Sequence, residues 1–482
     1  MNLALMLEDA TKKFAERTVL ISDGQRINYD LLNRRVNTIA NLLRKNSIRK
    51  GDKIALMLPN MPEFVYCYFA VIKLGAVAVA LNPSSTSHEL MYLLENSESK
   101  ILMTSEVNRK KYEDIQTKLS FCKAMMTVDS PDENTPFNNA ISAGPFSFTN
   151  VIINPEDPAA IIYTSGLTGK SLGAVLTHRN LYSQSHLIQT FVKRTFEDVG
   201  LSLIPLFHSF GATVNMINVI RTGCSVVMMD RFTMDGIFSA IQKNKITYIC
   251  AVPRLYLGMM FHENAAKYDV SSLEVCVTGG APMPAEFLPK FEKQFGVKIV
   301  EGYGLTEASP ACSFNMLDRP QKPGSIGMAI TGTKIKIVDE NGSEVPKGEV
   351  GELILKGDNV MQGYYKDDVA TAAVIKDGWL FTGDLGKMDG DDYIFLTGLK
   401  KRMIITSGFN VYPKEIEDVL NLHPAVKSAR VIAKKDLMRG EIVKAEIILV
   451  NGSAVDEKEI LRHCRVYLSS YKIPREVEFQ NQ

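Results

Sequence analysis

Short apolar runs alternate with amphipathic helical segments between residues 54 and 304, and this alternation restricts the fold more than any other feature. Apolar strands separated by such helices form parallel sheets that helices cover on both faces. We expect strands at 54–59, 77–83, 100–105, 201–207, 224–230, 246–253, 273–282 and 297–304, and helices at 62–75, 87–97, 211–222, 234–244 and 284–295. The sequence therefore predicts an α/β fold with two layered sheets within about residues 1–323.

The pattern changes after about residue 324. Apolar and polar residues then alternate singly, and Glu-Asn-Gly and Pro-Lys-Gly turns interrupt residues 333–357, which predicts an antiparallel meander or a small β-barrel. A basic segment, GLKKR, precedes a last region of short apolar runs and two helices. The expected organisation is a large N-terminal domain at 1–397 with its β-barrel part at 324–397, a hinge at 398–402 and a small α+β C-terminal domain at 403–482.

Charge and composition narrow the classes of partner. The 482 residues include 55 basic and 54 acidic side chains, so the balance gives no reason to expect a nucleic acid. The seven cysteines lie far apart without a CxxC pair, which indicates buried thiols in a reducing compartment. No apolar run approaches the roughly 18 residues of a membrane span, and the N-terminus lacks a signal-peptide pattern. We expect a cytoplasmic protein, and peripheral membrane contact stays open.

A turn rich in glycine and hydroxyl groups lies between the apolar runs 160–163 and 174–176. Backbone N–H groups in such a turn form a concave anion site, so it is a candidate phosphate loop. Its candidate ligands are Thr164, Ser165, Gly166, Thr168, Gly169 and Lys170. The turn differs from a P-loop at Thr164, and the following LGAVLTH predicts a strand rather than a helix. The alternative, a P-loop phosphotransferase, requires a helix that starts near Lys170.

Four further segments carry candidate ligand residues. The segment VEGYGLTE ends a strand, where ligands bind in α/β sheets, and it holds Glu301, Gly302, Tyr303, Gly304, Thr306 and Glu307. The Tyr303 ring suits a purine base, and the Glu307 carboxylate suits a divalent cation. Gly279, Gly280 and Ala281 end the neighbouring strand. Asp384 suits two ribose hydroxyls or an Asx-turn, and His208 lies among aromatic residues, where a packed histidine is the alternative.

Together these motifs resemble those of the adenylate-forming superfamily of acyl-CoA synthetases, luciferases and peptide-synthetase adenylation domains. The resemblance covers nearly the whole chain, in order and spacing. It rests on YTSGLTGKSLGAV (163–175), PLFHSFG (205–211), GGAP (279–282), GYGLTE (302–307), GELILKG (351–357), GYY (363–365), WLFTGD (379–384) and MIITSGFNVYPKEIE (403–417).

The resemblance implies a ligase that uses ATP, Mg²⁺ and coenzyme A. A carboxylate attacks the α-phosphate of ATP to give an acyl-adenylate, the small domain turns on its hinge, and a thiol then attacks the activated carbonyl. The implied roles are phosphate binding by Thr164 and the loop, Mg²⁺ binding by Thr164 and Glu307, adenine binding by Tyr303 and Gly279–Ala281, ribose binding by Asp384, gating of the acyl pocket by His208, hinging at Lys401, and a pantetheine path along Ser407 and Gly408.

The chain departs from the family at several positions. Leu167, Ser171 and Leu172 replace a threonine, a proline and a lysine of the phosphate loop, and Leu399 replaces an arginine that binds ribose. Family members also continue past the position of Gln482 into a segment with a lysine that assists adenylation, so we expect a truncated chain. These departures favour the alternative of a degenerate member that binds nucleotide or acyl ligands with little turnover.

The acid substrate is expected to be a medium- or long-chain fatty acid. The form GFNVYPKEIE is more similar to fatty-acyl-CoA synthetases than to aromatic-acid ligases. The strands expected around the acyl pocket are rich in flexible apolar side chains, which suit an alkyl tail. These are Met216, Met228, Met229, Met259, Met260 and Phe261, for which a place in the ordinary core is the alternative.

Overall fold

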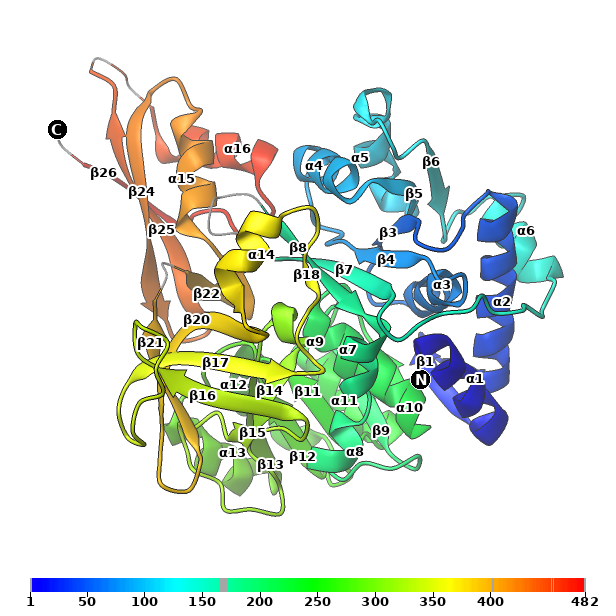
Figure 1. Ribbon diagram of the computed structural model, residues 1–482, viewed down its shortest axis with the longest axis horizontal. Coiled ribbons are helices and arrows are strands. Elements are labelled where there is room, and N and C mark those ends of the chain that lie inside the picture. The colour runs from blue at the N-terminus through cyan, green and yellow to red at the C-terminus, as the bar shows by residue number, and fades with distance from the viewer. Residues whose placement is uncertain (1, 165–170, 401–402, 452, 454, 481–482) are drawn as a thin grey trace.

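The computed structural model describes residues 2–164, 171–400, 403–451, 453 and 455–480. A seven-stranded sheet forms one half of the large N-terminal part (Figure 1), in the order β18-β8-β7-β4-β3-β5-β6. Its strands are β3 (Lys53–Met57), β4 (Val77–Ala80), β5 (Ser99–Thr104), β6 (Ala124–Thr127), β7 (Pro158–Thr164), β8 (Leu172–Thr177) and β18 (Gly363–Tyr364). The strands from β7 to β6 are parallel, whereas β8 pairs antiparallel with both β7 and β18.

A nine-stranded sheet forms the other half, in the order β15-β14-β13-β12-β11-β9-β10-β1-β2. Its strands are β1 (Thr18–Ser22), β2 (Gln25–Asn28), β9 (Val199–Ser202), β10 (Ser225–Met228), β11 (Tyr248–Ala251), β12 (Val275–Thr278), β13 (Lys298–Gly304), β14 (Ala311–Phe314) and β15 (Met328–Ala329). It is parallel from β13 to β1 and antiparallel at both ends. The two predicted layered sheets are confirmed.

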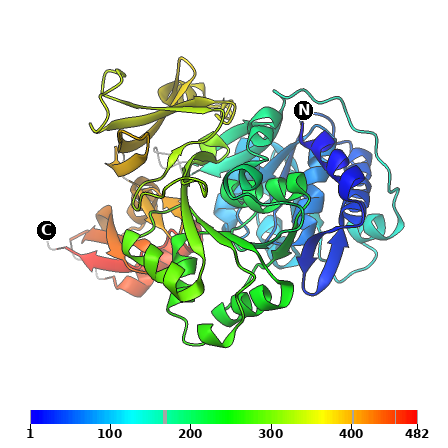
Figure 2. The ribbon, with the colours of Figure 1, turned by 90° about the horizontal axis from the view of Figure 1, so that it is seen from below.

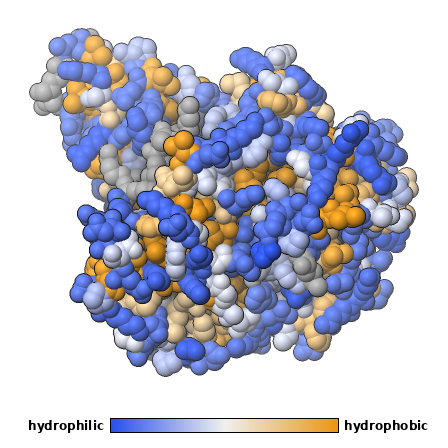
Figure 3. Space-filling view, viewed as in Figure 1, coloured by the Kyte–Doolittle hydropathy of each residue, from blue (hydrophilic) through white to orange (hydrophobic). Residues whose placement is uncertain are grey.

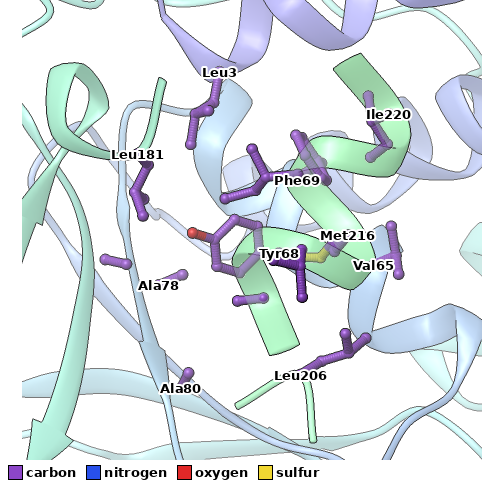
Figure 4. Close-up of a cluster of buried hydrophobic side chains, with 14 of the residues drawn as sticks. Leu3, Val65, Tyr68, Phe69, Ala78, Ala80, Leu181, Leu206, Met216 and Ile220 are labelled. Carbon is purple, nitrogen blue, oxygen red and sulfur yellow. The ribbon is translucent and has the colours of Figure 1, made fainter. Parts of the chain in front are cut away.

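Helices cover both faces of each sheet. They are α1 (Leu3–Phe14), α2 (Tyr29–Lys45), α3 (Pro62–Lys73), α4 (Ser87–Ser97), α5 (Arg109–Glu113), α6 (Pro136–Ala143), α7 (His178–Ser183), α8 (Leu187–Phe191), α9 (Ser209–Ala212), α10 (Asn218–Thr222), α11 (Met234–Asn244), α12 (Pro253–Met260), α13 (Leu288–Phe295) and α14 (Asp368–Val374). The largest hydrophobic cluster joins the facing sides of the sheets through α1, α2, α3 and α10. Figure 4 shows Tyr68 and Phe69 of α3 within it. Separate clusters lie under α11–α13 and under α4 and α5.

A five-stranded antiparallel sheet follows, which confirms the antiparallel pattern predicted for residues 333–357. Its strands are β16 (Thr333–Val338), β17 (Gly351–Gly357), β19 (Ile375–Lys376), β20 (Trp379–Met388) and β21 (Ile394–Leu399). The order is β16-β17-β20-β19, and β21 also pairs with β20. The strand pairs among the described residues make a row rather than a closed ring, so the sheet resembles the expected meander more than the expected barrel.

The smaller C-terminal domain has its own sheet and core (Figures 1 and 2). Its elements are β22 (Ile404–Thr406), β23 (Phe409–Val411), α15 (Pro413–Asn421), β24 (Val426–Asp436), β25 (Gly440–Leu449), α16 (Glu457–Tyr467) and β26 (Glu476–Phe479). The hydrophobic cluster of this domain contains only residues after Met403. The boundaries at 397 and 403 stay predictions.

Several expectations about single elements need correction. The expected strand 201–207 ends at Ser202, and the helix expected at 211–222 begins at Ser209 and contains a π-helical turn at Thr213–Ile217.

The seven cysteines are free and buried, as expected. Within the described residues, no helix combines the length and the apolar character needed to cross a bilayer. Apolar side chains reach the face seen in Figure 3 in separate patches among polar ones.

Candidate active site

The candidate phosphate loop joins the two strands of a β-hairpin. Thr164 is the last residue of β7 and pairs with Leu172, the first residue of β8. A strand therefore stands where a P-loop needs a helix, and the phosphotransferase alternative is wrong. The predicted ligands Ser165, Gly166, Thr168, Gly169 and Lys170, together with Leu167, lie outside the described residues.

Thr164 and Glu307 come together although 143 positions separate them. The Thr164 hydroxyl donates to Glu307 Oε1 at 3.3 Å, and the Tyr364 hydroxyl donates to the same oxygen at 2.9 Å. Glu307 follows β13 on a 3₁₀ turn (Thr306–Ala308), and Tyr364 reaches it from β18. Sequence reasoning assigned no role to Tyr364, although it quoted the GYY motif that contains it.

These oxygen atoms suit Mg²⁺. Magnesium is commonly held by one or two carboxylates together with water and substrate phosphates. Among the described residues there is no cluster of three or more His, Cys, Asp or Glu side chains that would hold a metal by itself. The donor set at Thr164 and Glu307 therefore fits a cation that a bound triphosphate also ligates.

Tyr303 and Asp384 form a second pair beside this one. The Tyr303 hydroxyl donates to Asp384 Oδ2, and burial together with the Asp384 charge raises the pKa of Tyr303 well above its usual range. Asp384 lies on β20, directly opposite Leu399 of β21. The carboxylate expected to bind ribose thus has a leucine as its cross-strand neighbour, at the position where the resemblance places an arginine.

Glycines leave room along the ends of β12 and β13. A Cβ on Gly304 would lie 2.0 Å from the Pro310 carbonyl oxygen, and one on Gly302 would lie 2.6 Å from the Phe314 ring. Gly279 and Gly280 line the cavity described below, but Ala281 and Glu301 do not. Glycine at 302 and 304 therefore lets the backbone approach its neighbours closely.

Glu301 supports a turn rather than lining the site. Its carboxylate accepts the Met283 N–H at 3.1 Å, which fixes the segment that follows β12. Burial raises the pKa of Glu301 to about 7, and the hydrogen bond opposes this rise. We therefore regard Glu301 as a positioning residue for Gly279 and Gly280.

Two cavities meet at the end of β13. The first, of about 120 Å³, lies between α8, α9 and the ends of β12, β13 and β14, and most of its lining is apolar. The second, of about 570 Å³, lies between the seven-stranded sheet, α4 and the C-terminal domain, and Thr164 lines it. His208, Thr306 and Asn410 line both cavities.

His208 lies at this junction as a neutral side chain. It is the N-cap of α9, where its Nδ1 accepts the Phe210 N–H at 3.2 Å. Burial lowers the pKa of His208 to about 4. Its ring meets Phe409 of the C-terminal domain edge-on at 6.4 Å, and Phe409 stacks on Tyr471 at 4.6 Å. The position where the two cavities meet fits the expected gate, and the packed aromatic surroundings fit the alternative too.

The C-terminal domain reaches the site through residues 407–410. Gly408 (φ +86°) lines the first cavity, and a Cβ there would lie 2.6 Å from Val252. The Ser407 hydroxyl instead accepts from Arg254 at 3.2 Å and from Arg439 at 3.5 Å. Lys401, the expected hinge residue, lies outside the described residues.

A buried ion cluster also joins the two domains. Lys472 donates to Glu89 of α4 at 2.9 Å and to Glu415 of α15 at 2.7 Å, and the Ser469 hydroxyl donates to Glu89 at 2.6 Å. Lys472 is 5% exposed at its side chain. The same Glu89 carboxylate accepts the Thr86 N–H at 2.9 Å in the capping box of α4. We call Glu89, Glu415, Ser469 and Lys472 the interdomain cluster.

The methionines expected around the acyl pocket are elsewhere. None of the residues named for that role lines either cavity. Met216 and Met228 are buried in the cluster between the sheets, Met259 and Met260 belong to the cluster under α11–α13, and Phe261 is 58% exposed. Their alternative, ordinary core packing, holds for the methionines. The residues of α8 that do line the cavity were missed, because five residues carry no periodic signal.

The chain matches two families of known proteins. Residues 7–365 match the AMP-binding enzyme family, and residues 415–482 match the AMP-binding enzyme C-terminal domain. A long-chain-fatty-acid–CoA ligase of Bacillus subtilis is 33% identical over 513 aligned residues, which cover 100% of this chain and 91% of the relative. A feruloyl-CoA synthase of Amycolatopsis is 32% identical over 468 residues, covering 96% and 92%.

Solved structures agree with this fold. An o-succinylbenzoate CoA synthetase from Bacillus subtilis, bound with a product analogue, superposes with a TM-score of 0.88 at 28% identity and covers 99% of this chain and 95% of that one. An amide bond synthetase from Marinactinospora thermotolerans gives a TM-score of 0.92 at 24% identity, covering 100% and 96%. The latter likeness concerns the fold alone.

Proposed function

Since the chain belongs to the AMP-binding enzyme family, we propose that it is an ATP-dependent carboxylic acid–CoA ligase that forms an acyl-adenylate and then acyl-CoA. Several relatives are named as CoA ligases or synthases, at 29–33% identity over nearly the whole chain. Its co-substrates are accordingly ATP and CoA, and its metal is Mg²⁺. A cytoplasmic location and the hinge at 398–402 remain predictions.

In the first step a carboxylate oxygen of the acid bonds to the α-phosphorus of ATP, and pyrophosphate leaves. The side chains have little covalent work to do, because positioning and charge stabilisation dominate such transfers. Thr164 and Glu307 would hold Mg²⁺, which supplies positive charge to the phosphate oxygens. Tyr364 orients the Glu307 carboxylate from β18. Asp384, which lies next to Tyr303, accepts hydrogen bonds from the ribose hydroxyls.

In the second step the sulfur of CoA bonds to the acyl carbon, and AMP leaves. The acyl carbon would lie where the two cavities meet, so the tail occupies the first cavity and the thiol arrives through the second. The lowered pKa of His208 leaves it neutral at pH 7, so it shapes the junction without adding a charge. Residues 408–410 complete this junction from the C-terminal domain.

The acid is proposed to be a medium- or long-chain fatty acid. The first cavity is lined by apolar side chains from α8, β11, β12 and β14, which suits an alkyl tail. The relatives named as long-chain-fatty-acid–CoA ligases support this choice. Because another relative is named as a feruloyl-CoA synthase, the acids to be tested should include an aromatic acid.

The pairing of Thr164, which lines the second cavity, with Glu307 carries the proposal. Its test is carboxylate-dependent release of pyrophosphate from Mg-ATP, measured across a panel of acids with and without CoA. We expect Glu307→Gln to lower kcat by about 100-fold or more, because the carboxylate charge that would hold Mg²⁺, and through it the phosphates, is lost. The exposed Glu340→Gln serves as the matched control. Equal rates for the two variants would contradict the role of Glu307.

The second candidate function is binding without turnover, and two leucines favour it. Leu399 lies beside Asp384, and the next residue, Lys400, donates to Glu352 at 2.9 Å. Leu172 lies opposite Thr164. Leu172→Lys combined with Leu399→Arg therefore returns two charges to the neighbourhood of the nucleotide. Pyrophosphate release that appears only in this double variant would favour the second candidate, and release by the unchanged chain would exclude it.

A further inference from the structure

The closed end of the first cavity is formed by α8. Leu187, Ile188, Phe191 and Val192 line the first cavity, but none of them lines the second. The opposite end contains His208, Thr306 and Asn410, which both cavities share. In Figure 1 α8 lies at the lower edge of the molecule, away from the C-terminal domain. An acyl tail whose carboxyl group lies at the junction therefore points toward α8.

Two aromatic rings narrow this end. Phe191 of α8 and Phe314 of β14 face each other with ring centroids 5.7 Å apart. Phe191 is 4% exposed and Phe314 is 9% exposed, and both line the cavity. Phe314 also packs against Gly302, whose Cβ position is 2.6 Å from the ring. Phe314 therefore has no room to retreat toward β13.

Hydrogen bonds hold α8 in place. The buried Asn218 accepts the Ile188 N–H at 3.1 Å and donates to the carbonyl oxygens of Gln184 and Thr213, each at 2.8 Å. After α8, the Arg194 N–H donates to the Ile188 carbonyl oxygen at 2.9 Å, and its guanidinium pairs with Asp198 and Glu274. The wall is thus fixed at both ends and does not yield easily to a longer tail.

The small volume of the first cavity limits the length of the acyl tail that it can hold. An apolar cavity of about 150 Å³ is large enough for benzene, and the present cavity measures about 120 Å³. We propose that Phe191 and Phe314 are the residues that set acyl length, and that they favour medium-chain over long-chain acids. This inference rests on the proposed ligase function and selects the medium-chain end of its substrate range.

The test compares straight-chain acids from butanoate to hexadecanoate in the pyrophosphate assay. The wild type should prefer octanoate to dodecanoate and hexadecanoate. Phe191→Ala should raise the ratio of kcat/KM for dodecanoate to that for octanoate by about 10- to 200-fold, the range expected when methylene groups gain a pocket. Phe191→Leu should move the ratio in the same direction by less.

The matched control is Phe291→Ala. Phe291 is fully buried in the cluster under α11–α13 and lines neither cavity, so its truncation weakens the fold without lengthening the pocket. It should leave the ratio unchanged. A thermal-shift series with the same acids measures binding to the cavity without turnover. The acid that raises Tm most should have a longer chain for Phe191→Leu than for the wild type.

The outcomes separate the two proposals. Activity in the wild type that is highest with hexadecanoate, or a length profile that Phe191→Ala and Phe191→Leu leave unchanged, overturns the length limit and leaves the ligase function standing. Pyrophosphate release with none of the acids overturns the ligase function with fatty acids. In that case the thermal-shift series still decides whether the cavity discriminates by length, and equal shifts for all lengths overturn the limit.

Discussion

Single residues of the site were predicted where a motif places a charged or aromatic group at a strand end. Thr164, Glu307, Tyr303 and Asp384 meet as two hydrogen-bonded pairs, although three strands of three different sheets and one 3₁₀ turn carry them. Glu301, from the same motif, accepts the Met283 N–H instead, although it lies two positions from Tyr303 on β13, where alternation alone places both side chains on one side of the strand. The motif alone does not say which of its carboxylates meets the ligand.

The buried Glu301 leads to a prediction about pH. The pKa of Glu301 is about 7 in the folded protein and about 4.3 in an unfolded chain. The folded state therefore binds the proton more tightly, so this group favours folding below pH 4.3 and loses that contribution as pH rises through 7. Relative to Glu301→Gln, the wild type should lose up to about 3 kcal/mol of unfolding free energy between pH 5 and pH 8.

Urea unfolding of both proteins at the two pH values measures this difference. Glu340→Gln, at an exposed position, should follow the wild type at both pH values. A pH-independent difference between Glu301→Gln and the wild type would show that the carboxyl group is not protonated on folding.

At the scale of elements, the alternation of apolar runs and helices predicted both sheets, because burial on both faces leaves a clear pattern. Short elements without such a pattern were not predicted. The π-helical turn at Thr213–Ile217 and the five residues of α8 depend on tertiary contacts, chiefly those of Asn218. The part of the first cavity that α8 forms therefore became visible only in the structure.

Asn218 tests how far α8 depends on these contacts. Asn218→Ala removes the partners of three buried backbone groups, so we expect a loss of about 3 kcal/mol in unfolding free energy. Asn46→Ala is the control, because Asn46 makes an exposed side-chain hydrogen bond, and it should cost under about 1 kcal/mol. Urea unfolding measures both. Equal losses would mean that α8 is held by packing alone.

At the scale of the whole molecule, the order of a large part and a small part was predicted from the basic segment GLKKR at 398–402 and the short apolar runs and helices after it. The contact between the two parts was not predicted from the sequence, since Lys472 and Glu89 are 383 positions apart and neither stands out in the sequence. The interdomain cluster is buried, so its charges depend on one another. Removal of one member leaves an unpaired buried charge, which commonly costs several kcal/mol.

Lys472→Met should therefore release the C-terminal domain from α4. We expect faster limited proteolysis between the two domains and a wider distribution of distances between spin labels placed one on each. Lys434→Met is the control, because Lys434 pairs with Glu476 on the exposed surface of the C-terminal domain, where ion pairs contribute about 0–1 kcal/mol. Identical distance distributions for Lys472→Met and the wild type would contradict a holding role for the interdomain cluster.

The Glu89 carboxylate links helix α4 to the C-terminal domain, because it accepts hydrogen bonds from both. It closes the first turn of α4 through the Thr86 N–H and also binds Ser469 and Lys472 of the other domain. Any rotation that withdraws Lys472 leaves the carboxylate to the helix alone and changes the protection of the Thr86 amide against hydrogen exchange. His88 and Tyr92, which line the second cavity, follow on the same helix. The first turn of α4 thus depends on the position of the C-terminal domain, and the same helix lines the second cavity, the proposed entry route of the thiol.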